Sequence, residues 1–589
     1  MFFNKRTHTC GELRESDIGQ PVVLNGWVDT RRDLGGLIFI DLRDRYGITQ
    51  IVFEPSLSEE AHNLAKDLRS EFVISVEGTV RRRPPETDNA ALPTGHIDVM
   101  VKKLVILNEA KTTPFPIRDK IDTSEDIRLK YRYLDLRRPS VQKNLLLRHK
   151  MYQIVRKYFD ENNFVEIETP VLMKSTPEGA RDYLVPSRIH KGKFYALPQS
   201  PQTYKQLLMV SGFDRYFQIV KCYRDEDLRA DRQPEFTQID VEMSFVDQED
   251  VFQTVEGLMK LLYKEIWNLE LQLPLPRFTF DEAMEKYGSD KPDLRFNLEL
   301  TTLNKVFANT TFKVFKDQID SGGITTGLWA NGCGDYTRNQ LDVLTDFVKK
   351  LGAGGLIWMR VKEDGELEAP IAKFLTDEEK KNLVSAINAK PGDLIFILTG
   401  SRLKTLNIMG QLRLEMARRL DLIKADSPPK LLWVTDFPLF KWDEETKRFY
   451  AMHHPFTSPR SEDVKLMDSH PEKVKARAYD LVLNGNEIAG GSIRIHNASL
   501  QAKMFKALGI GHEEAERKFG FLMKAFKFGA PPHGGIAFGF DRMAMIFTGE
   551  SSIREVIAFP KTASAISLMD DSPSNVSEEQ LRELHIKIR

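Results

Sequence analysis

The stretch from Tyr216 to Phe245 holds the densest set of reactive side chains in the sequence, between two apolar, alternating segments. This alternation predicts two strands joined by a charged loop. The loop contains Arg224, Asp225, Glu226, Asp227, Arg229, Asp231 and Arg232. Such a loop is usually a solvated turn with weak ion pairs, and on the pattern alone that is the simpler reading.

A second candidate lies at Gly534 to Gly549, where a glycine-rich strand leads directly into an apolar helix. Gly539 allows backbone to approach a ligand closely, and Arg542 stands near the helix start, where phosphate oxygens bind well. On the pattern alone, packing is the simpler explanation for the glycines.

The elements before these strings begin with five short β-rich runs: Val22 to Val28, Leu37 to Arg43, Ile48 to Phe53, Phe72 to Val80, and His96 to Leu107. Five strands of this spacing predict a small OB-type barrel, which often binds single-stranded nucleic acid. Arg31, Arg32, Phe39 and Arg43 could form the binding face. Alternatively, Phe39 is core and the arginines are a solvated rim.

The rest of the chain divides at a proline-rich segment, Thr112 to Pro116, which predicts a hinge. A helix is expected from about Val141 to Asn162, followed by a strand at Phe164 to Glu168. Residues 295–425 are predicted to form a separate α/β region. It should contain a helix ending at Gly352, strands at 356–361 and 394–398, and a helix opened by a capping box at Thr376 and Glu379.

The bulk composition is that of an ordinary globular chain of several domains, with 589 residues, 41% hydrophobic, 29% charged and net charge −1. The basic excess lies in the connector 114–150, with ten Lys and Arg against five Asp and Glu. The absence of a long apolar run or secretory leader, and only three cysteines, predict a cytoplasmic protein without membrane spans or disulfides.

Three strings together resemble the class II aminoacyl-tRNA synthetases: Phe164 to Pro170 is similar to that family's first motif, the Arg224-Asp225-Glu226 loop to its second, and Gly539 to Arg542 to its third. Four further strings are similar to the bacterial aspartate-specific members: Ser175 to Asp182, Gln199 to Gln202, His453 to Thr457, and Gly490 to Arg494. The resemblance spans nearly the whole chain. It implies ATP-dependent attachment of L-aspartate to tRNA(Asp), through an aspartyl-adenylate.

The resemblance assigns ATP to residues of the second and third motifs. Arg224 would hold the α-phosphate and Arg542 the γ-phosphate, and these two are the expected catalytic residues. Phe236 would stack on adenine opposite Arg542, and Glu226 would accept from its amino group. Asp480 and Glu487 would hold Mg²⁺, which prefers carboxylate oxygens. The remaining expected ATP-binding residues are Asp225, Gln233, Gly539, Phe540 and Asp541.

For the amino acid, the resemblance implies that Arg494 and Lys205 grip the side-chain carboxylate, so that asparagine would leave cations unpaired. The α-ammonium group would go to Glu178, Gln202 and Asp240, with Ser200 and His453 nearby, and Arg224 also belongs to this set. For Asp240 or Asp480 alone, an ordinary cap or surface carboxylate is the simpler reading.

In the barrel, Arg32, Phe39 and Gln50 match positions that bind anticodon bases in relatives. Leucine at position 34 tends to accompany enzymes restricted to the aspartate tRNA, whereas histidine accompanies those that also charge the asparagine tRNA. The family's first motif builds a two-fold interface around its proline, here Pro170, so a homodimer is expected.

The expected fold is multidomain α+β: an OB-type barrel, an antiparallel catalytic sheet flanked by helices, and an α/β insertion. The predicted limits are 1–112 for the barrel, 113–140 for a hinge, 141–294 and 426–560 for the catalytic parts, 295–425 for the insertion, and 561–589 for a C-terminal extension. The segment Leu394 to Gly400 lacks the Gly-Ala-Asp triplet typical of this insertion.

Alternatives within the class are an enzyme that also charges tRNA(Asn), and behind it an asparaginyl or lysyl enzyme. A lysyl pocket should carry carboxylates where Arg494 and Lys205 stand. A non-catalytic RNA-binding descendant should have lost part of the ATP set, yet all of its residues are present.

Overall fold

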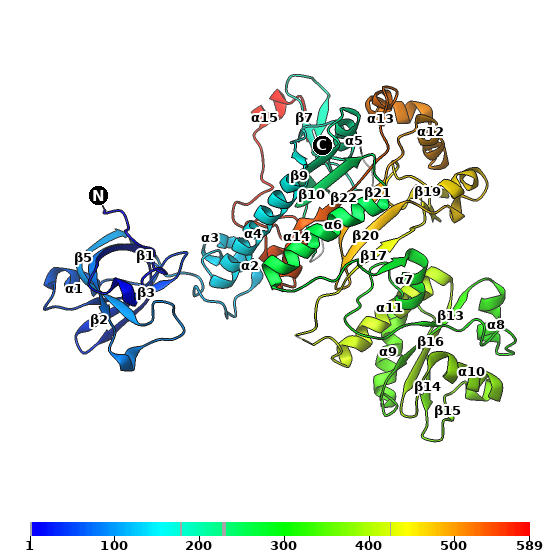
Figure 1. The fold of residues 1–589 in the computed structure, drawn as a ribbon, viewed down its shortest axis with the longest axis horizontal. Helices are drawn as coiled ribbons and strands as arrows, with labels where there is room; N and C mark the ends of the chain where they lie inside the picture. Colours follow the sequence, from blue (N-terminus) through cyan, green and yellow to red (C-terminus); the bar gives the residue numbers. More distant parts are fainter. Residues whose placement is uncertain (1–2, 177–179, 227–230, 425, 589) are drawn as a thin grey trace. The chain divides into compact units, whose positions relative to one another are not determined.

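The computed structural model describes residues 3–176, 180–226, 231–424 and 426–588 (Figure 1). It divides into two compact units, one of Met1–Arg148 with Arg554–Ser574, the other of His149–Ile553 with Asn575–Arg589. Within the described residues, no helix is long and apolar enough to cross a membrane.

The first unit contains a closed five-stranded barrel in the order β1-β2-β3-β5-β4, which confirms the predicted OB-type barrel. Its elements are β1 (Pro21–Leu34), β2 (Leu37–Arg43), β3 (Ile48–Phe53), α1 (Glu59–Ala65), β4 (Val73–Arg82) and β5 (Ile97–Asn108). Strand β1 runs six residues beyond the predicted end at Val28, because its polar second half pairs with β2 as far as Leu34 and Leu37. Gly35 and Gly36, both at positive φ, make the two-residue turn.

Two short helices, α2 (Glu125–Lys130) and α3 (Arg132–Asp135), lie in the segment predicted as a hinge. Buried Arg132 donates to the carbonyls of Ile557 and Ala558 at 2.8 and 2.9 Å, and Arg554 pairs with Glu125 at 2.7 Å. The connector is therefore tied to the chain segment that begins at Arg554. The predicted domain limits themselves stay a prediction.

The second unit is built on an eight-stranded sheet in the order β11-β17-β20-β21-β22-β10-β9-β6. The pairs are antiparallel except at the two edges, where β11 pairs with β17 and β6 with β9 in parallel. The strands are β6 (Val165–Glu166), β9 (Arg215–Tyr223), β10 (Glu235–Ser244), β11 (Arg277–Thr279), β17 (Leu431–Thr435), β20 (Ala478–Leu483), β21 (Asn486–Ile493) and β22 (His533–Gly539).

Helices pack on this sheet, as expected for the catalytic fold: α6 contacts β22, α14 contacts β10, and α5 contacts β9 and β10. The helices around it are α4 (Pro139–Glu161), α5 (Gln202–Val210), α6 (Gln248–Leu262), α7 (Phe280–Tyr287), α12 (Ala498–Ala507), α13 (His512–Phe526), α14 (Phe540–Thr548) and α15 (Glu578–Glu583). The strand and helix predicted around Gly539 are thus β22 and α14, and the hairpin predicted from 216 to 245 is β9 and β10.

A smaller five-stranded sheet, β12-β13-β16-β14-β15, forms the α/β insertion that the sequence predicts (Figure 1). Its elements are β12 (Thr301–Thr302), α8 (Lys313–Asp320), β13 (Ile324–Ala330), α9 (Arg338–Lys350), β14 (Ile357–Val361), β15 (Leu367–Glu368), α10 (Asp377–Ile387), β16 (Leu394–Gly400) and α11 (Arg402–Arg419). The capping box at Thr376 and Glu379 opens α10 as predicted.

Two separate hairpins complete the second unit: β7 (Leu184–Pro186) with β8 (Phe194–Ala196), and β18 (Phe440–Asp443) with β19 (Arg448–Ala451). Both lead directly into pocket residues, because Gln199 and Ser200 follow β8, and Met452, His453 and His454 follow β19.

Candidate active site

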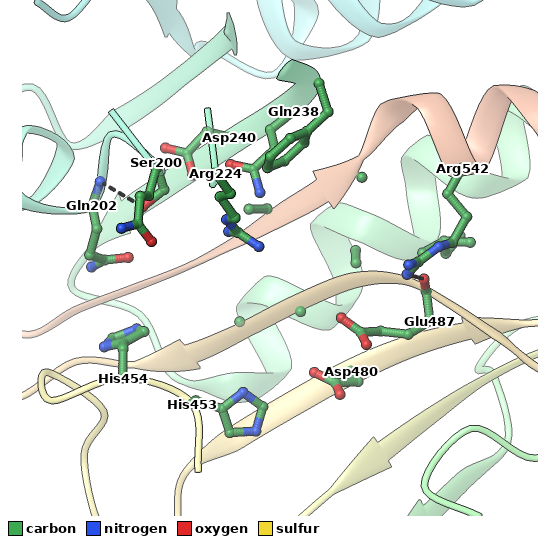
Figure 2. Close-up of a pocket in the computed structure, with 18 of the residues that line it drawn as sticks. Ser200, Gln202, Arg224, Gln238, Asp240, His453, His454, Asp480, Glu487 and Arg542 are labelled. Atoms are coloured by element: carbon green, nitrogen blue, oxygen red, sulfur yellow. Dashed lines mark hydrogen bonds between the residues drawn. The ribbon is translucent and has the colours of Figure 1, made fainter. Parts of the chain in front are cut away.

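A cavity of about 640 Å³ opens over the middle of the large sheet. It brings together most of the residues predicted from sequence, from β10, β20, β21, β22, α5, α14 and the loops beside them. The predicted residues that line it are Ser200, Gln202, Lys205, Arg224, Glu226, Gln233, Phe236, Asp240, His453, Asp480, Glu487, Arg494, Gly539, Asp541 and Arg542. Figure 2 shows Gln202, Asp240 and His454 at one end and Arg542, Glu487 and Asp480 at the other.

The first end of the cavity is a buried cluster of alternating charges. Lys205 Nζ donates to Asp240 Oδ1 at 2.7 Å and lies 3.2 Å from Glu242 Oε2. Arg494 holds Glu242 with two hydrogen bonds, from Nε at 3.0 Å and from the second terminal nitrogen at 3.2 Å. All four side chains are at most 3% exposed. We call Lys205, Asp240, Glu242 and Arg494 the buried charge cluster.

The charges in this cluster shift each other's protonation. Burial favours the neutral form of Glu242, but Arg494 and Lys205 outweigh it and hold its pKa at about 2. Burial raises the pKa of Asp240, and Lys205 only partly opposes this shift. Arg494 is desolvated too, but Glu242 raises the pKa of the guanidinium.

Strand register explains why two carboxylates meet here. Asp240 and Glu242 are two residues apart on β10, so they point to the same face of the sheet. Gly535 on β22 pairs with Glu242, and a Cβ atom built there would lie 2.1 Å from Glu242 Oε2. The glycine-rich strand therefore makes room for a buried carboxylate, which is a packing role for one of its glycines.

Counting hydrogen-bond donors shows what the cluster can still bind. Lys205 has three N–H groups and two acceptors, Asp240 and Glu242. Arg494 has five, of which two go to Glu242 and one to Ser492 Oγ at 2.8 Å, while its first terminal nitrogen also lies beside His454 Nε2. At least one N–H of each cation is left without an acceptor among the described residues. Asp240 Oδ2 is buried and, within the same part of the chain, accepts no hydrogen bond.

Two histidines close this end of the cavity. Burial, reinforced by the positive charge of Arg494, lowers the pKa of His453 to about 4 and also lowers the pKa of His454 well below its ordinary value. His454 Nδ1 accepts from the backbone N–H of Phe456 at 3.1 Å, so the neutral ring carries its proton on Nε2, the nitrogen that lies beside Arg494. Both rings are neutral near pH 7.

The opposite end holds cations in exchangeable contacts. The Arg224 guanidinium lies 5.0 Å from the centroid of the Phe236 ring. Arg542 donates to the carbonyl of Glu487 at 2.6 Å and to Asp231 Oδ2 at 3.0 Å. The second pair is partly solvated, with Asp231 46% exposed, so it is a weak contact that an anionic ligand can displace.

Other predicted residues of the nucleotide set have different surroundings. Phe540 is fully buried and stacks on Tyr152 with ring centroids 4.4 Å apart. Asp541 accepts from the backbone N–H of Thr237 at 2.8 Å, which ties α14 to β10. Asp225 lies 3.5 Å from Arg181. Among the described residues, Asp225 and Phe540 are outside the cavity lining, and Glu178 lies outside the described residues.

Asp480 and Glu487 are the residues present that fit a divalent cation. A Cβ built on Gly490 would lie 2.8 Å from Asp480 Oδ1 and 3.6 Å from Glu487 Oε1, so both carboxylates approach one point above that glycine. Asp480 Oδ1 is buried and has no hydrogen-bond partner within the described residues. Burial and the charges of Glu487 and Asp290 raise the pKa of Asp480. A hard cation such as Mg²⁺ would relieve this repulsion.

In the barrel, the predicted anticodon residues share one outer face. Ile38, Ile40 and Leu42 of β2 are fully buried in the barrel core, which points Phe39 outward and removes the alternative that Phe39 is a core residue. Arg32 pairs with Phe39 across the strands and donates to Gln50 at 3.2 Å. Leu34 stands at the tip of the β1–β2 hairpin and is 62% exposed.

Glu242, His454, Ser492 and Asp231 belong to the site but were not predicted from sequence as members of it. Asp231 lies in the charged loop of the stretch Tyr216 to Phe245, and Glu242 in the second strand of that stretch. His454 and Ser492 lie in the motifs His453 to Thr457 and Gly490 to Arg494. The available signal for Glu242 was its spacing of two from Asp240, which puts both residues on the same face of a strand. Alternation alone does not say whether that face lines a cavity.

The fold and the site together define a class II tRNA synthetase. The molecule has the antiparallel sheet with three ordered motifs, cations at both ends of one cavity, and an OB barrel. The family model described as "tRNA synthetases class II (D, K and N)" matches residues 124–563. A second family model, described as "OB-fold nucleic acid binding domain", matches residues 22–107. The chain belongs to this family, among its bacterial aspartate–tRNA ligases.

The relatives that place it there are similar over their full length. It is 57% identical to the Aspartate--tRNA(Asp/Asn) ligase of Caldanaerobacter subterraneus subsp. tengcongensis, covering 99% of this chain and 98% of the relative. It is 53% identical to the enzyme of the same name from Desulfotalea psychrophila, covering 99% and 96%. In fold it is similar to the asparaginyl-tRNA synthetase of Pyrococcus horikoshii, with a TM-score of 0.59, 19% identity, and coverage of 94% and 98%.

Proposed function

We propose that this enzyme attaches L-aspartate to tRNA(Asp) in two steps, forming aspartyl-adenylate with release of pyrophosphate and then transferring aspartate to the 3′-terminal adenosine. The observation that carries the choice of amino acid is the buried charge cluster. Its two cations each keep one N–H for a ligand, and a carboxylate is the acceptor that suits two convergent charged donors.

The cluster also explains discrimination against asparagine. The free N–H groups of Lys205 and Arg494 would both donate to the aspartate side chain, whereas an amide offers one oxygen and adds two donors of its own. Asp240 Oδ2, Gln202 and Glu178 would receive the α-ammonium group, with Ser200 and His453 nearby. Rejection of an analogue that leaves such buried groups unpaired can reach ~10⁴.

ATP would occupy the opposite end, where charge neutralisation and positioning supply most of the catalysis. Arg224 would hold the α-phosphate and Arg542 the γ-phosphate in exchange for Asp231. Phe236 would stack on adenine, and Glu226 would accept from its amino group. Gln233, Asp225 and Gly539 to Asp541 complete the nucleotide set. Mg²⁺ held by Asp480 and Glu487 would neutralise phosphate charge.

The outer barrel face, with Arg32, Phe39 and Gln50, would bind anticodon bases by stacking and hydrogen bonding. We also expect a homodimer formed around Pro170 and a cytoplasmic location, as the first motif and the composition suggest.

A second candidate is an enzyme that charges both tRNA(Asp) and tRNA(Asn). It is favoured by the two relatives above, which are both named as ligases for tRNA(Asp/Asn). Leu34, at an exposed hairpin tip, favours the restricted enzyme, because leucine at this position tends to accompany that specificity in relatives. The two observations point in opposite directions, so the tRNA has to be varied directly.

The test is charging of purified tRNA(Asp) and tRNA(Asn) transcripts with labelled aspartate, alongside aspartate-dependent pyrophosphate exchange. We expect exchange and charging of tRNA(Asp), with both activities nearly lost in Arg494→Ala. Charging of both tRNAs would establish the second candidate, and Leu34→His should then leave the ratio unchanged. No exchange by the wild-type enzyme would overturn the proposal.

A further inference from the structure

The turn of the β7–β8 hairpin is exposed and carries basic side chains but no acidic ones. This turn, residues 187–193, carries Arg188, His190, Lys191 and Lys193, all exposed. No aspartate or glutamate occurs between Asp182 and Asp214. Within the described residues, none of these four side chains has an acidic partner within 4 Å. In a chain of net charge −1, this concentration of positive charge is a local feature.

The hairpin is a formed structure with a defined turn. Ser187 N–H donates to the carbonyl of Lys193 at 2.9 Å, His190 N–H to Ser187 Oγ at 3.0 Å, and Gly192 takes a positive φ of 72°. The strands pair at Val185 with Tyr195 and at Pro186 with Phe194. Phe194 is 47% exposed and Tyr195 39%, so aromatic rings accompany the cations.

The base of the hairpin lies beside the cavity, and the basic turn is at the other end of its three-residue strands. Ala196 at the end of β8 bridges to Met173, and Gln199, three residues later, lines the cavity. Three residues of extended chain span at most about 11 Å. The tRNA 3′ end must reach this cavity for aspartate to be transferred, and the arm behind it carries one phosphate per nucleotide.

We propose that the β7–β8 hairpin binds the acceptor arm of tRNA, its cations contacting backbone phosphates and its exposed rings contacting the unpaired 3′ bases. This inference rests on the proposed function, since it assigns a binding surface to the second step of that reaction. Basic side chains interleaved with aromatic rings are the pattern that binds single-stranded nucleic acid. Clusters of one sign of charge repel each other and are often interaction segments, which favours binding of an anionic partner here.

The experiment compares two triple variants, each losing three positive charges. The hairpin variant is Arg188→Gln/Lys191→Gln/Lys193→Gln, and the control is Lys157→Gln/Lys260→Gln/Lys264→Gln, on exposed positions of α4, α6 and the turn after α6. Pyrophosphate exchange, which needs no tRNA, should be unchanged in both. The hairpin variant should raise the KM for tRNA(Asp) roughly tenfold and lower the slope of log Kd against log salt by about two.

Two outcomes for the hairpin variant overturn the inference. An unchanged KM for tRNA, or the same change in the control, would show that the hairpin makes no specific contact with RNA. A change of oligomeric state in sedimentation would instead make the hairpin an interface between copies of the chain. Loss of exchange in the wild type would be a failure of the proposed function, which is a separate result. In a third variant, Tyr195→Ala, the KM for tRNA should rise while the salt slope stays constant, because stacking releases no counterions.

Discussion

The two ends of the cavity differ in how firmly their charged side chains are held by neighbouring residues. At the amino-acid end, Lys205, Asp240, Glu242 and Arg494 are buried and held by short hydrogen bonds. At the nucleotide end, Arg542 and Arg224 rest on contacts that a ligand must replace, namely a half-exposed carboxylate and an aromatic face. With the proposed assignment, selectivity for aspartate would depend on a preorganised site, whereas ATP binding would involve an exchange of partners.

The largest expected effect comes from removing one charge of the buried cluster. Glu242→Gln keeps the shape but leaves Lys205 and Arg494 opposed only by Asp240, and a buried charge without its partner costs about 3–5 kcal/mol. We expect a lower thermal midpoint, partly restored by saturating aspartate, whose carboxylate replaces the lost charge.

The matched control for Glu242→Gln is Glu226→Gln, a carboxylate of the same cavity paired with Arg232 at 2.9 Å in a more solvated place. Its thermal midpoint should change little. Equal destabilisation in both variants would mean that the two ends of the cavity do not differ in the way described.

At the nucleotide end, Arg542→Ala should reduce kcat/KM for ATP by about 100-fold, close to 3 kcal/mol of transition-state stabilisation, because the cation acts on phosphate charge. The KM for aspartate should stay within twofold of the wild type. Pyrophosphate exchange at varied ATP and varied aspartate measures both, and a parallel rise of the two KM values would contradict separate ends.

Acidification should test the neutral histidine at the amino-acid end. His453 has a pKa of about 4 in the folded enzyme against 6.5 ordinarily, so the unfolded chain takes up the proton first as the pH falls. Its contribution to stability is complete above pH 6.5 and is lost between pH 6.5 and 4, by about 2 kcal/mol at pH 5.

The measurement is the thermal midpoint at pH 7.5 and pH 5 in the wild type and in His453→Gln. The wild type should lose more stability over this interval than the variant does. The same loss in both proteins would show that other groups carry the pH dependence.

The smallest effect concerns Asp231, which holds Arg542 in a partly solvated pair. Asp231→Ala releases the arginine, and since such a pair contributes ~0.5 kcal/mol, the KM for ATP should fall about twofold. Glu444→Ala, which removes an exposed carboxylate paired with Lys447, serves as the control with no expected change.

Sequence reasoning predicted those parts of the molecule that depend on local pattern. The five barrel strands, the β9–β10 hairpin, the strand and helix around Gly539 and the capping box of α10 all follow from alternation, turns or caps. Helices α2 and α3 were missed, because each is a short element of six or four residues beside a proline-rich segment. Strand β1 was predicted too short, because its outer half is polar on both faces.

For the site, motif resemblance supplied residues that the fold does bring to one cavity, but it could not supply their partners. That Arg494 binds Glu242 depends on β21, β22 and β10 lying side by side, and these strands are far apart in sequence. Likewise, the contact between Arg542 and Asp231 joins residues 311 positions apart. The roles toward ATP, aspartate and tRNA stay predictions until the variants are measured.

The glycine opposite Glu242 limits which mutations can be tolerated at position 535. A methyl group at Gly535 would meet the carboxylate at 2.1 Å, and it would also meet the carbonyl of Val241 at 2.1 Å. Every amino-acid replacement reachable from a glycine codon by one nucleotide change adds at least that carbon. A saturation-mutagenesis selection should therefore find position 535 as intolerant as position 242, although no ligand need touch the glycine.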